Sequence, residues 1–456
     1  MNSPQQQSSA TSESTPQSTP QPLPSLRETL PVWLKIGLLS FGGPAGQIAL
    51  MHRLLVEERR WVSEPQFLHA LNFCMLLPGP EAQQLATYVG WLMHGTRGGF
   101  IAGTLFVLPG AIVILALSVL YAFFQGVPLL EAVFLGIKAA VLIIVIEAVI
   151  RIGRKVLKNM AMVLIAVAAF IGIFAFALPF PLIVLSAAII GFVGARTSRG
   201  NFDINGAAKE QLQAPSAPPS LLRSATVLLC GLSLWALPVL VAFVVLGADH
   251  VFVAEGLFFS KLATVTFGGA YAVLAYMAQE AVVLHGWLSA GEMIDGLGLA
   301  ESTPGPLIMV TQFVGFLGAL RNPGPFEPLT AAVLGSALTV WATFVPCFLW
   351  IFLGAPYVER LRGNVQLSGA LSAITAAVVG VILNLALWFG MHVLFREVTT
   401  VNAWLIHIAV PTLSSLVPIA AILAAVAALA LLRFKLGVIK TLALCATLSC
   451  LLSWLM

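Results

Sequence analysis

Charged side chains are scarce in this sequence. Asp, Glu, Lys and Arg make up only 9% of its 456 residues, whereas 59% are hydrophobic. Soluble domains carry about 25% charged residues, so this balance excludes a soluble globular protein. The net charge is only +4, and the positive residues fall between apolar runs, where they report membrane orientation. We therefore expect a lipid bilayer around the chain and no nucleic-acid partner.

The motifs of common enzymes and ATP-driven pumps are also missing. The chain has no C-x-x-C, no H-E-x-x-H and no G-x-x-x-x-G-K-[ST] sequence. Its five cysteines lie mostly in apolar runs, as is typical of small packing residues. These absences argue against a membrane-embedded redox enzyme or hydrolase. The sequence predicts no enzyme activity, no cofactor and no metal.

Long apolar runs predict an all-α polytopic membrane protein. Thirteen runs reach the ~20 residues that an α-helix needs to cross a bilayer. They cover residues 29–51, 67–93, 99–124, 130–150, 160–177, 179–195, 225–247, 251–279, 291–319, 328–353, 366–391, 402–431 and 438–456. Residues 1–27, rich in Gln, Ser, Thr and Pro, are expected to form a disordered tail, and residues 196–224 a cytoplasmic linker.

Two helix-breaking motifs occur twice in the chain at one spacing. F-G-G and P-G-P occupy Phe41–Gly43 and Pro78–Pro80, and both return at the same sequence offset, at Phe267–Gly269 and Pro304–Pro306. Broken backbone at membrane depth is tolerated only where protein or a water-filled cavity surrounds it. Two broken segments in corresponding positions of two halves are typical of a transporter's binding site.

The number of spans makes the two halves antiparallel. Six spans within residues 28–195 return the chain to its starting side, and one unpaired helix within 225–250 carries it across before the second repeat, 251–456. With a cytoplasmic N-terminus, most basic loops fall inside, as the positive-inside rule requires. The loop 52–66 would lie outside despite its arginines. A re-entrant hairpin at 29–51 or 67–93 would shift this assignment.

The broken segments predict an anion-binding site. A helix that begins within the bilayer presents free backbone N–H groups at the positive end of its dipole. The candidate substrate-binding residues are the two pairs of motifs and the amides that follow them: Gly42, Gly43, Gln47, Pro78, Gly79, Pro80, Gln83, Gly268, Gly269, Pro304, Gly305 and Pro306. Gln84, Tyr271 and Thr311 are polar neighbours. The alternative is a kinked helix at a close helix contact, but repetition at one offset favours the site.

Lys35 and Lys261 complete the predicted substrate site. Each precedes the Phe of an F-G-G motif by the same short distance, inside an apolar run where a lysine is costly unless it faces a cavity or reaches the interface. A cation near each half-helix N-terminus would make an anion site. The alternative is that both side chains snorkel to the membrane surface.

Three carboxylates are candidates for proton coupling. Glu81 and Glu301 adjoin the two P-G-P motifs, and Glu147 lies in the span 130–150 together with Lys138. Carboxylates inside a membrane often serve in proton relays. The alternatives are helix capping at a positive dipole end for the first two, and an interhelical contact for Glu147 and Lys138.

Together these motifs resemble the chromate ion transporter family in its long two-domain form. The resemblance rests on F-G-G-P, L-L-P-G-P-E-A-Q-Q-L-A-T-Y-V-G-W, the H-G-x-R-G-G turn, F-V-L-P-G and the second F-G-G with S-T-P-G-P, and it covers about residues 28–456. It implies export of chromate across the bacterial inner membrane, driven by the membrane potential or a proton gradient, and chromate resistance. The second copy departs from the first: Ala270 replaces the proline after F-G-G, and Met309-Val310 replace Gln83-Gln84.

The residues alone predict an anion transporter with inverted repeats and go no further. Chromate and sulfate are both tetrahedral dianions of similar size, so uptake or exchange of sulfate or another oxyanion is the alternative function. A channel is also compatible with two halves around a gap. A homo-oligomer is compatible with the sequence as well.

Overall fold

The computed structural model describes residues 24–197, 220–267, 270–357, 365–403 and 406–455. Most of the predicted tail and linker therefore lie outside the described residues, as do Gly268 and Gly269. The predicted all-α polytopic membrane fold is confirmed. Six described helices are long and apolar enough to cross a membrane, and several shorter apolar helices accompany them.

The described part of the first half is built from α-helices. They are α1 (Leu26–Leu39), α2 (Gly43–His52), α3 (Glu64–Cys74), α4 (Glu81–Phe124), α5 (Pro128–Val156), α6 (Met160–Phe176) and α7 (Phe180–Thr197). A π-helical turn, Arg53–Glu58, extends α2. Inside α4 the backbone leaves the helical conformation at His94 and Gly95, so two helices meet there at a sharp turn. This is the tight turn at H-G-x-R-G-G.

The second half repeats this order after α9 (Leu221–Leu246). Its elements are α10 (Val251–Val265), α11 (Ala270–Ala278), α12 (Ala290–Ser302), α13 (Val310–Arg321), α14 (Pro328–Gly354), α16 (Val365–Leu394), the strands β1 (Val398–Ala403) and β2 (Ile406–Pro411), α17 (Pro418–Ala428) and α18 (Val438–Leu455). A π-helical turn, Gln279–Leu284, extends α11 at the place that corresponds in the repeat to Arg53–Glu58. Ser63 and Ser289 form matching capping boxes at the starts of α3 and α12.

Glycine conformation ends the helices at the predicted breaks. Gly42 and Gly43 adopt φ of +81° and +75° between α1 and α2. Gly79 (φ +127°) and Gly305 (φ +100°) occupy the P-G-P loops. Residues with a Cβ rarely adopt such angles, so glycine is required where the chain must leave the helix within the membrane.

The shortness of the broken helices corrects the prediction that 29–51 and 67–93 each cross the membrane. A helix the length of α1, Leu26–Leu39, spans about 21 Å of the ~30 Å hydrocarbon layer. The His94 ring lies 2.7 Å from the Pro24 carbonyl oxygen. Hence the first part of α4, which starts just after the P-G-P motif at Pro78–Pro80, returns to the face from which α1 starts. We call it the linker face, because α7 ends and α9 begins there.

The second half is arranged in the opposite sense. Ser224, near the start of α9, hydrogen-bonds Tyr357, just after α14, at 2.8 Å. The start of α10 lies beside the loop that follows α13, where His250 contacts Gly324. Thus α10 and α13 reach the other face, which carries the β1–β2 hairpin and is here called the hairpin face. This opposition is that of an inverted repeat.

A further predicted span, residues 402–431, is wrong. The single helix expected over residues 402–431 is replaced at its start by β1 and β2, which pair as an antiparallel hairpin in which Val398 is opposite Pro411. Proline at 411 and 418 interrupts the apolar run, and its β-branched residues favour strands. The long helix of this region begins only at Pro418 and ends at Arg433.

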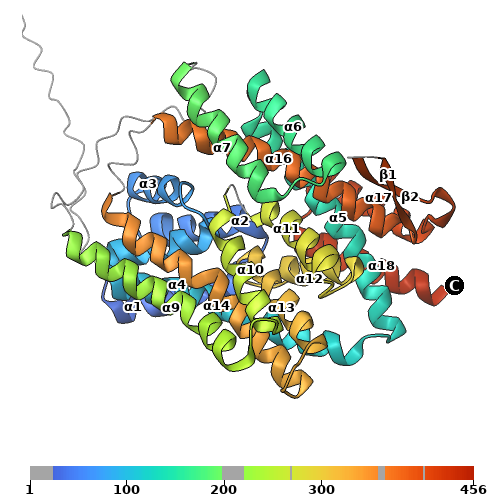
Figure 1. Cartoon of the computed structure of the whole chain (residues 1–456), viewed down its shortest axis with the longest axis horizontal. Coiled ribbons are helices and arrows are strands. Elements are labelled where there is room, and N and C mark those ends of the chain that lie inside the picture. Colours follow the sequence, from blue (N-terminus) through green and yellow to red (C-terminus); the bar gives the residue numbers. More distant parts are fainter. Residues whose placement is uncertain (1–23, 198–219, 268–269, 358–364, 404–405, 456) are drawn as a thin grey trace, which may run out of the picture.

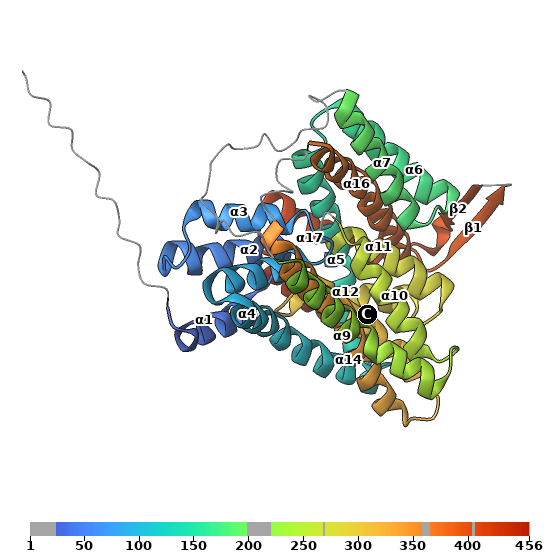
Figure 2. The ribbon, with the colours of Figure 1, turned by 60° about the vertical axis from the view of Figure 1, so that its left-hand side comes forward.

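The helices divide into two packed groups. The bundle consists of α5, α6, α7, α16, α17 and α18, and the core group of α1–α4 and α9–α14, with α9 against α14 and α10. In Figure 1 the bundle and the β1–β2 hairpin fill the upper and right-hand side, and α1 and α3 lie at the left. Figure 2 again shows α1–α3 apart from α6 and α7. The groups meet mainly where α5 packs on α12 and α16 packs on α11.

Candidate functional site: the junction of the broken helices

The two breaks meet and complete each other's backbone hydrogen bonding. The Gly79 N–H donates to the Thr266 carbonyl oxygen at 2.8 Å, and the Gly305 N–H donates to the Ser40 carbonyl oxygen at 2.9 Å. Gly79 and Gly305 are equivalent in the repeat, as are Ser40 and Thr266. This reciprocal pair is what a local two-fold axis produces. We call the region around it the junction.

The reciprocal bonds bear on how the P-G-P glycines could bind substrate. Their N–H groups are already used, so Gly79 and Gly305 join the halves in this structure and would bind an anion only after the pair separates. The site role of these glycines stays a prediction. The hydroxyl groups of Ser40 and Thr266 donate to Ile36 and Leu262 carbonyl oxygens, both at 2.6 Å.

Two of the predicted glutamines, Gln47 and Gln84, hydrogen-bond to the P-G-P loops of the junction. The Gln47 side-chain amide donates to the Gly305 carbonyl oxygen at 2.6 Å, which ties α2 to the P-G-P loop of the other half. Gln84 donates to the Pro78 carbonyl oxygen at 2.7 Å, whereas Gln83 donates to the Thr87 hydroxyl at 3.0 Å. All three side chains are buried. They lie in the junction or within one helical turn of it.

Tyr271 and Glu301 form the polar wall of the junction in the second half. The Tyr271 hydroxyl donates to the Glu301 carboxylate at 2.7 Å, and both residues are buried. A Cβ on Gly43 would lie 3.8 Å from the same hydroxyl, so the first-half break faces this pair. Glu301 thus stands where a proton candidate would be expected, although its coupling role stays a prediction.

Two cations on α5 lie within electrostatic range of acids at the junction. Arg151 lies within electrostatic range of Glu301 and Tyr271, and it pairs with Glu147 at 3.6 Å. Lys155, one turn later, lies within electrostatic range of Glu81. Both cationic side chains are exposed and so can meet an anion that arrives from water. Sequence reasoning treated them as orientation signals only; their i, i+4 spacing at the end of a span is the signal that could have marked them.

Lys35 and Lys261 do not approach the junction in this way. Both side chains are exposed, and the Lys261 ammonium lies over the Tyr276 ring at 5.5 Å from its centre. Among the contacts described for the chain, none joins either lysine to Gly43, Gly79 or Gly305. Their surface positions favour the snorkelling interpretation.

Sequence reasoning missed two buried acids. Glu255 on α10 is completely buried, and neither carboxylate oxygen has a hydrogen-bond partner among the described residues. Asp295 on α12 is 4% exposed; it accepts a hydrogen bond from Tyr121 at 2.9 Å and pairs with Lys138 at 3.2 Å. For Glu255 the signal is a lone acid within an apolar run, and for Asp295 it is a second acid three residues after Glu292 within the predicted span 291–319.

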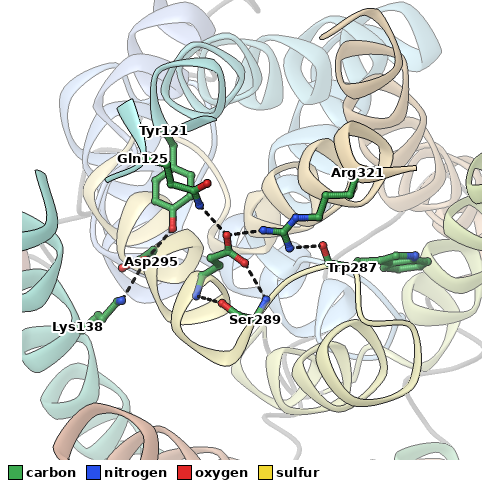
Figure 3. Close-up of polar contacts among 8 residues, drawn as sticks. Tyr121, Gln125, Lys138, Trp287, Ser289, Asp295 and Arg321 are labelled. Atoms are coloured by element: carbon green, nitrogen blue, oxygen red, sulfur yellow. Dashed lines mark hydrogen bonds and ion pairs between the residues drawn. The ribbon is translucent and has the colours of Figure 1, made fainter. Parts of the chain in front are cut away.

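Asp295 belongs to a polar network at a pocket on the hairpin face, shown in Figure 3. Arg321 on α13 pairs with Glu292 at 2.6 Å, and Gln125 donates to the same carboxylate at 2.7 Å. The pocket has a volume of about 790 Å³. It lies beyond the junction, toward the ends of α4 and α13.

The two halves differ in how far they are covered. Every described side chain of α11 is buried, and α12 is buried from Glu292 to Glu301. Their counterparts α2 and α3 instead have exposed residues and pack mainly on α1 and α4. The exposed positions are Ala45, Gly46, Ala49, Glu64, Pro65, Gln66, Leu68 and Asn72. The first-half helices α2 and α3 are therefore less covered by the rest of the protein than α11 and α12.

Comparisons with known proteins agree with the two-half architecture. The chromate transporter family matches residues 28–192 and 254–450, one region in each half. The chain is 34% identical over 357 residues to a chromate transport protein of Pseudomonas aeruginosa, which covers 77% of each chain. It is 28% identical over 366 residues to a probable chromate transport protein of Synechococcus elongatus, covering 80% of this chain and 85% of the relative.

A third relative extends this agreement. A chromate transport protein of Cupriavidus metallidurans is 27% identical over 366 residues, which cover 78% of this chain and 81% of the relative. No solved structure matches the chain. The family matches are to transporters, in keeping with the absence of enzyme motifs. On the two matched regions, each with its own broken helices, this chain belongs to the chromate transporter family.

Proposed function

We propose that the protein is a secondary active transporter that exports chromate from the bacterial cytoplasm and thereby confers chromate resistance. In this proposal it lies in the inner membrane with its N-terminus in the cytoplasm. The relatives' names supply the substrate class. The single observation that supports the transport mechanism is that α2 and α3 are more exposed than their counterparts α11 and α12. An alternating-access transporter exposes its central site to one side of the membrane at a time.

Charge supports the assignment of the linker face to the cytoplasm. The positive-inside rule places Lys and Arg on that side. Basic residues at or near the ends of helices on the linker face include Arg27, Arg97, Arg151, Arg154, Lys155, Lys158, Arg196, Arg223, Arg433, Lys435 and Lys440. An open linker side would then receive substrate from the cytoplasm, as an exporter requires.

Arg151 and Lys155 are the proposed first contacts of the oxyanion. A dianion loses its water shell on entering the protein, so fixed positive charge and donors must replace it. The two cations and the backbone at Gly43 offer these groups. Glu301 and Glu81 beside them would take up a proton as the anion enters or leaves.

Flux in everted membrane vesicles tests the proposal. Radiolabelled chromate should accumulate inside energised vesicles, and an uncoupler should abolish the accumulation. Excess sulfate separates the two oxyanions: strong competition together with sulfate accumulation would favour the alternative, a sulfate transporter. Chromate flux that persists without any gradient and never exceeds equilibration would instead indicate a channel.

A further inference from the structure

We infer that Asp295 is a proton-binding residue of the transport cycle, and that its ion pair with Lys138 is the contact broken by proton binding. The two residues belong to different helix groups: Lys138 to α5 of the bundle and Asp295 to α12 of the core group. Among ion pairs between residues that the structure describes, this is the one that joins the groups. Breaking this ion pair would therefore remove a direct contact that holds the two helix groups together.

The carboxylate of Asp295 is built to accept a proton. Lys138 and Tyr121 both contact Oδ2, whereas Oδ1 is buried and has no hydrogen-bond partner among the described residues. A proton on Oδ1 removes the negative charge that holds the Lys138 ammonium. The ammonium would then be a partly buried cation without its counter-ion, a costly state that moving toward water relieves.

The pocket gives protons from the hairpin face a route to this carboxylate. Asp295 and Lys138 both line it. The other ionisable groups at its wall are Glu131 on α5, Tyr121 on α4, Glu292 on α12 and Arg321 on α13, and α18 contributes Ser453. Three acids against two bases make the pocket negative overall, which attracts protons.

Comparison of the two repeats shows a lysine–carboxylate pair of this kind at the hairpin-face position and not at the equivalent linker-face position. The offset that relates Phe41 to Phe267 makes His69 the equivalent of Asp295. A slightly larger offset, which relates Pro109 inside α4 to Pro346 inside α14, makes Thr375 the equivalent of Lys138. The linker face therefore lacks a Lys–carboxylate pair at these positions. At these equivalent positions, protonation of a carboxylate can break an ion pair with lysine only on the hairpin side.

Accessibility of a cysteine at position 141 tests the inference in the full-length chain. Val141 is fully buried and lies against Gly298 in the α5–α12 contact, so Val141→Cys in a cysteine-free background becomes reachable only when the groups separate. Intact cells are labelled from outside with a membrane-impermeant thiol reagent at neutral and acidic external pH. We expect labelling to rise about tenfold on acidification, and Asp295→Asn to be labelled highly at both pH values.

Two comparisons keep this test decisive. Glu292→Gln alters an ion pair in the same pocket that stays within the core group, so labelling should respond to pH as in the parent. Asp295→Glu keeps a carboxylate and should keep the pH response if the fold is intact. Low labelling of Asp295→Asn with a normal pH response would overturn the inference. The inference rests on the proposed function, which decides which face lies outside the cell. Labelling needs no substrate, however, so this experiment can be interpreted even if the protein fails to transport chromate.

Discussion

A disulfide across the α5–α12 contact should lock the transporter. An added Cβ on Gly298 would lie 3.7 Å from the Ile137 Cβ. Disulfides have Cβ–Cβ separations of about 3.5–4.5 Å, so Ile137→Cys with Gly298→Cys has bonding geometry in the closed state. The double substitution also removes the Ile137 Cγ2 atom that would collide with the new Cβ. Gly298→Cys alone should instead destabilise the protein by about 1–3 kcal/mol through overpacking.

The magnitude follows from the geometry of the bond. A disulfide keeps the two Cα atoms within about 4.4–6.8 Å, so a cross-linked molecule cannot separate α12 from α5. Chromate flux after oxidation should therefore fall to the fraction of protein that is not cross-linked, and reduction should restore it. Flux is measured in vesicles, with the cross-linked fraction read from the same sample in a cysteine-free background.

A second disulfide within the core group serves as the control. Gly256 on α10 and Val239 on α9 have equivalent Cβ atoms 3.4 Å apart, close to bonding distance, but both helices belong to one group. Cross-linking Gly256→Cys to Val239→Cys should leave flux intact. If the fully cross-linked 137–298 protein transports chromate at its reduced rate, the α5–α12 contact does not open in the cycle and the reasoning fails.

Four further predictions concern the junction and its surroundings. Arg151→Ala and Lys155→Ala should each raise the chromate KM about tenfold, whereas the neighbouring Arg154→Ala should not; equal effects of all three would point to general surface charge. Lys35→Ala and Lys261→Ala should keep the chromate affinity of purified, monodisperse protein, and a tenfold loss would return these lysines to the site. Gly79→Ala should lower the melting temperature more than Gly126→Ala. Both glycines have positive φ, but only at Gly79 would the new Cβ lie 2.7 Å from the Gln84 side-chain amide. Similar melting temperatures for the two variants would count against this. Shortening the linker 196–224 by half should leave transport intact, which expression and flux of the shortened chain would check.

The sequence predicted the architecture where it rests on local chemistry. Glycine and proline set the breaks at the repeated F-G-G and P-G-P motifs, where the sequence predicted them. Hydropathy could not distinguish one crossing helix from two half-helices that turn back, because both bury the same apolar residues. It also mistook the run that contains β1 and β2 for a helix, since strand pairing depends on a partner and not on composition alone.

The site was harder to predict, because its contacts join distant parts of the chain. The repeat located Gly79, Gly305 and Gln47 correctly in one region, but spacing could not reveal that Ser40 and Thr266 would take up the free amides. Nor could it show which way a lysine or arginine points. Arg151 lies within electrostatic range of Glu301, whereas no contact between described residues joins Lys35 to the junction.

The reciprocal hydrogen bonds of the junction also constrain how the protein can be made. The Ser40 carbonyl oxygen can accept a hydrogen bond from the Gly305 amide only after synthesis has passed the second P-G-P motif. Until then the first half sits in the membrane with an incomplete backbone, which water or the insertion machinery must satisfy. We expect truncated chains that end after α9 to be degraded, and two halves supplied as separate chains to rescue each other. Assembly of the second half is then the step that commits the first half to its fold.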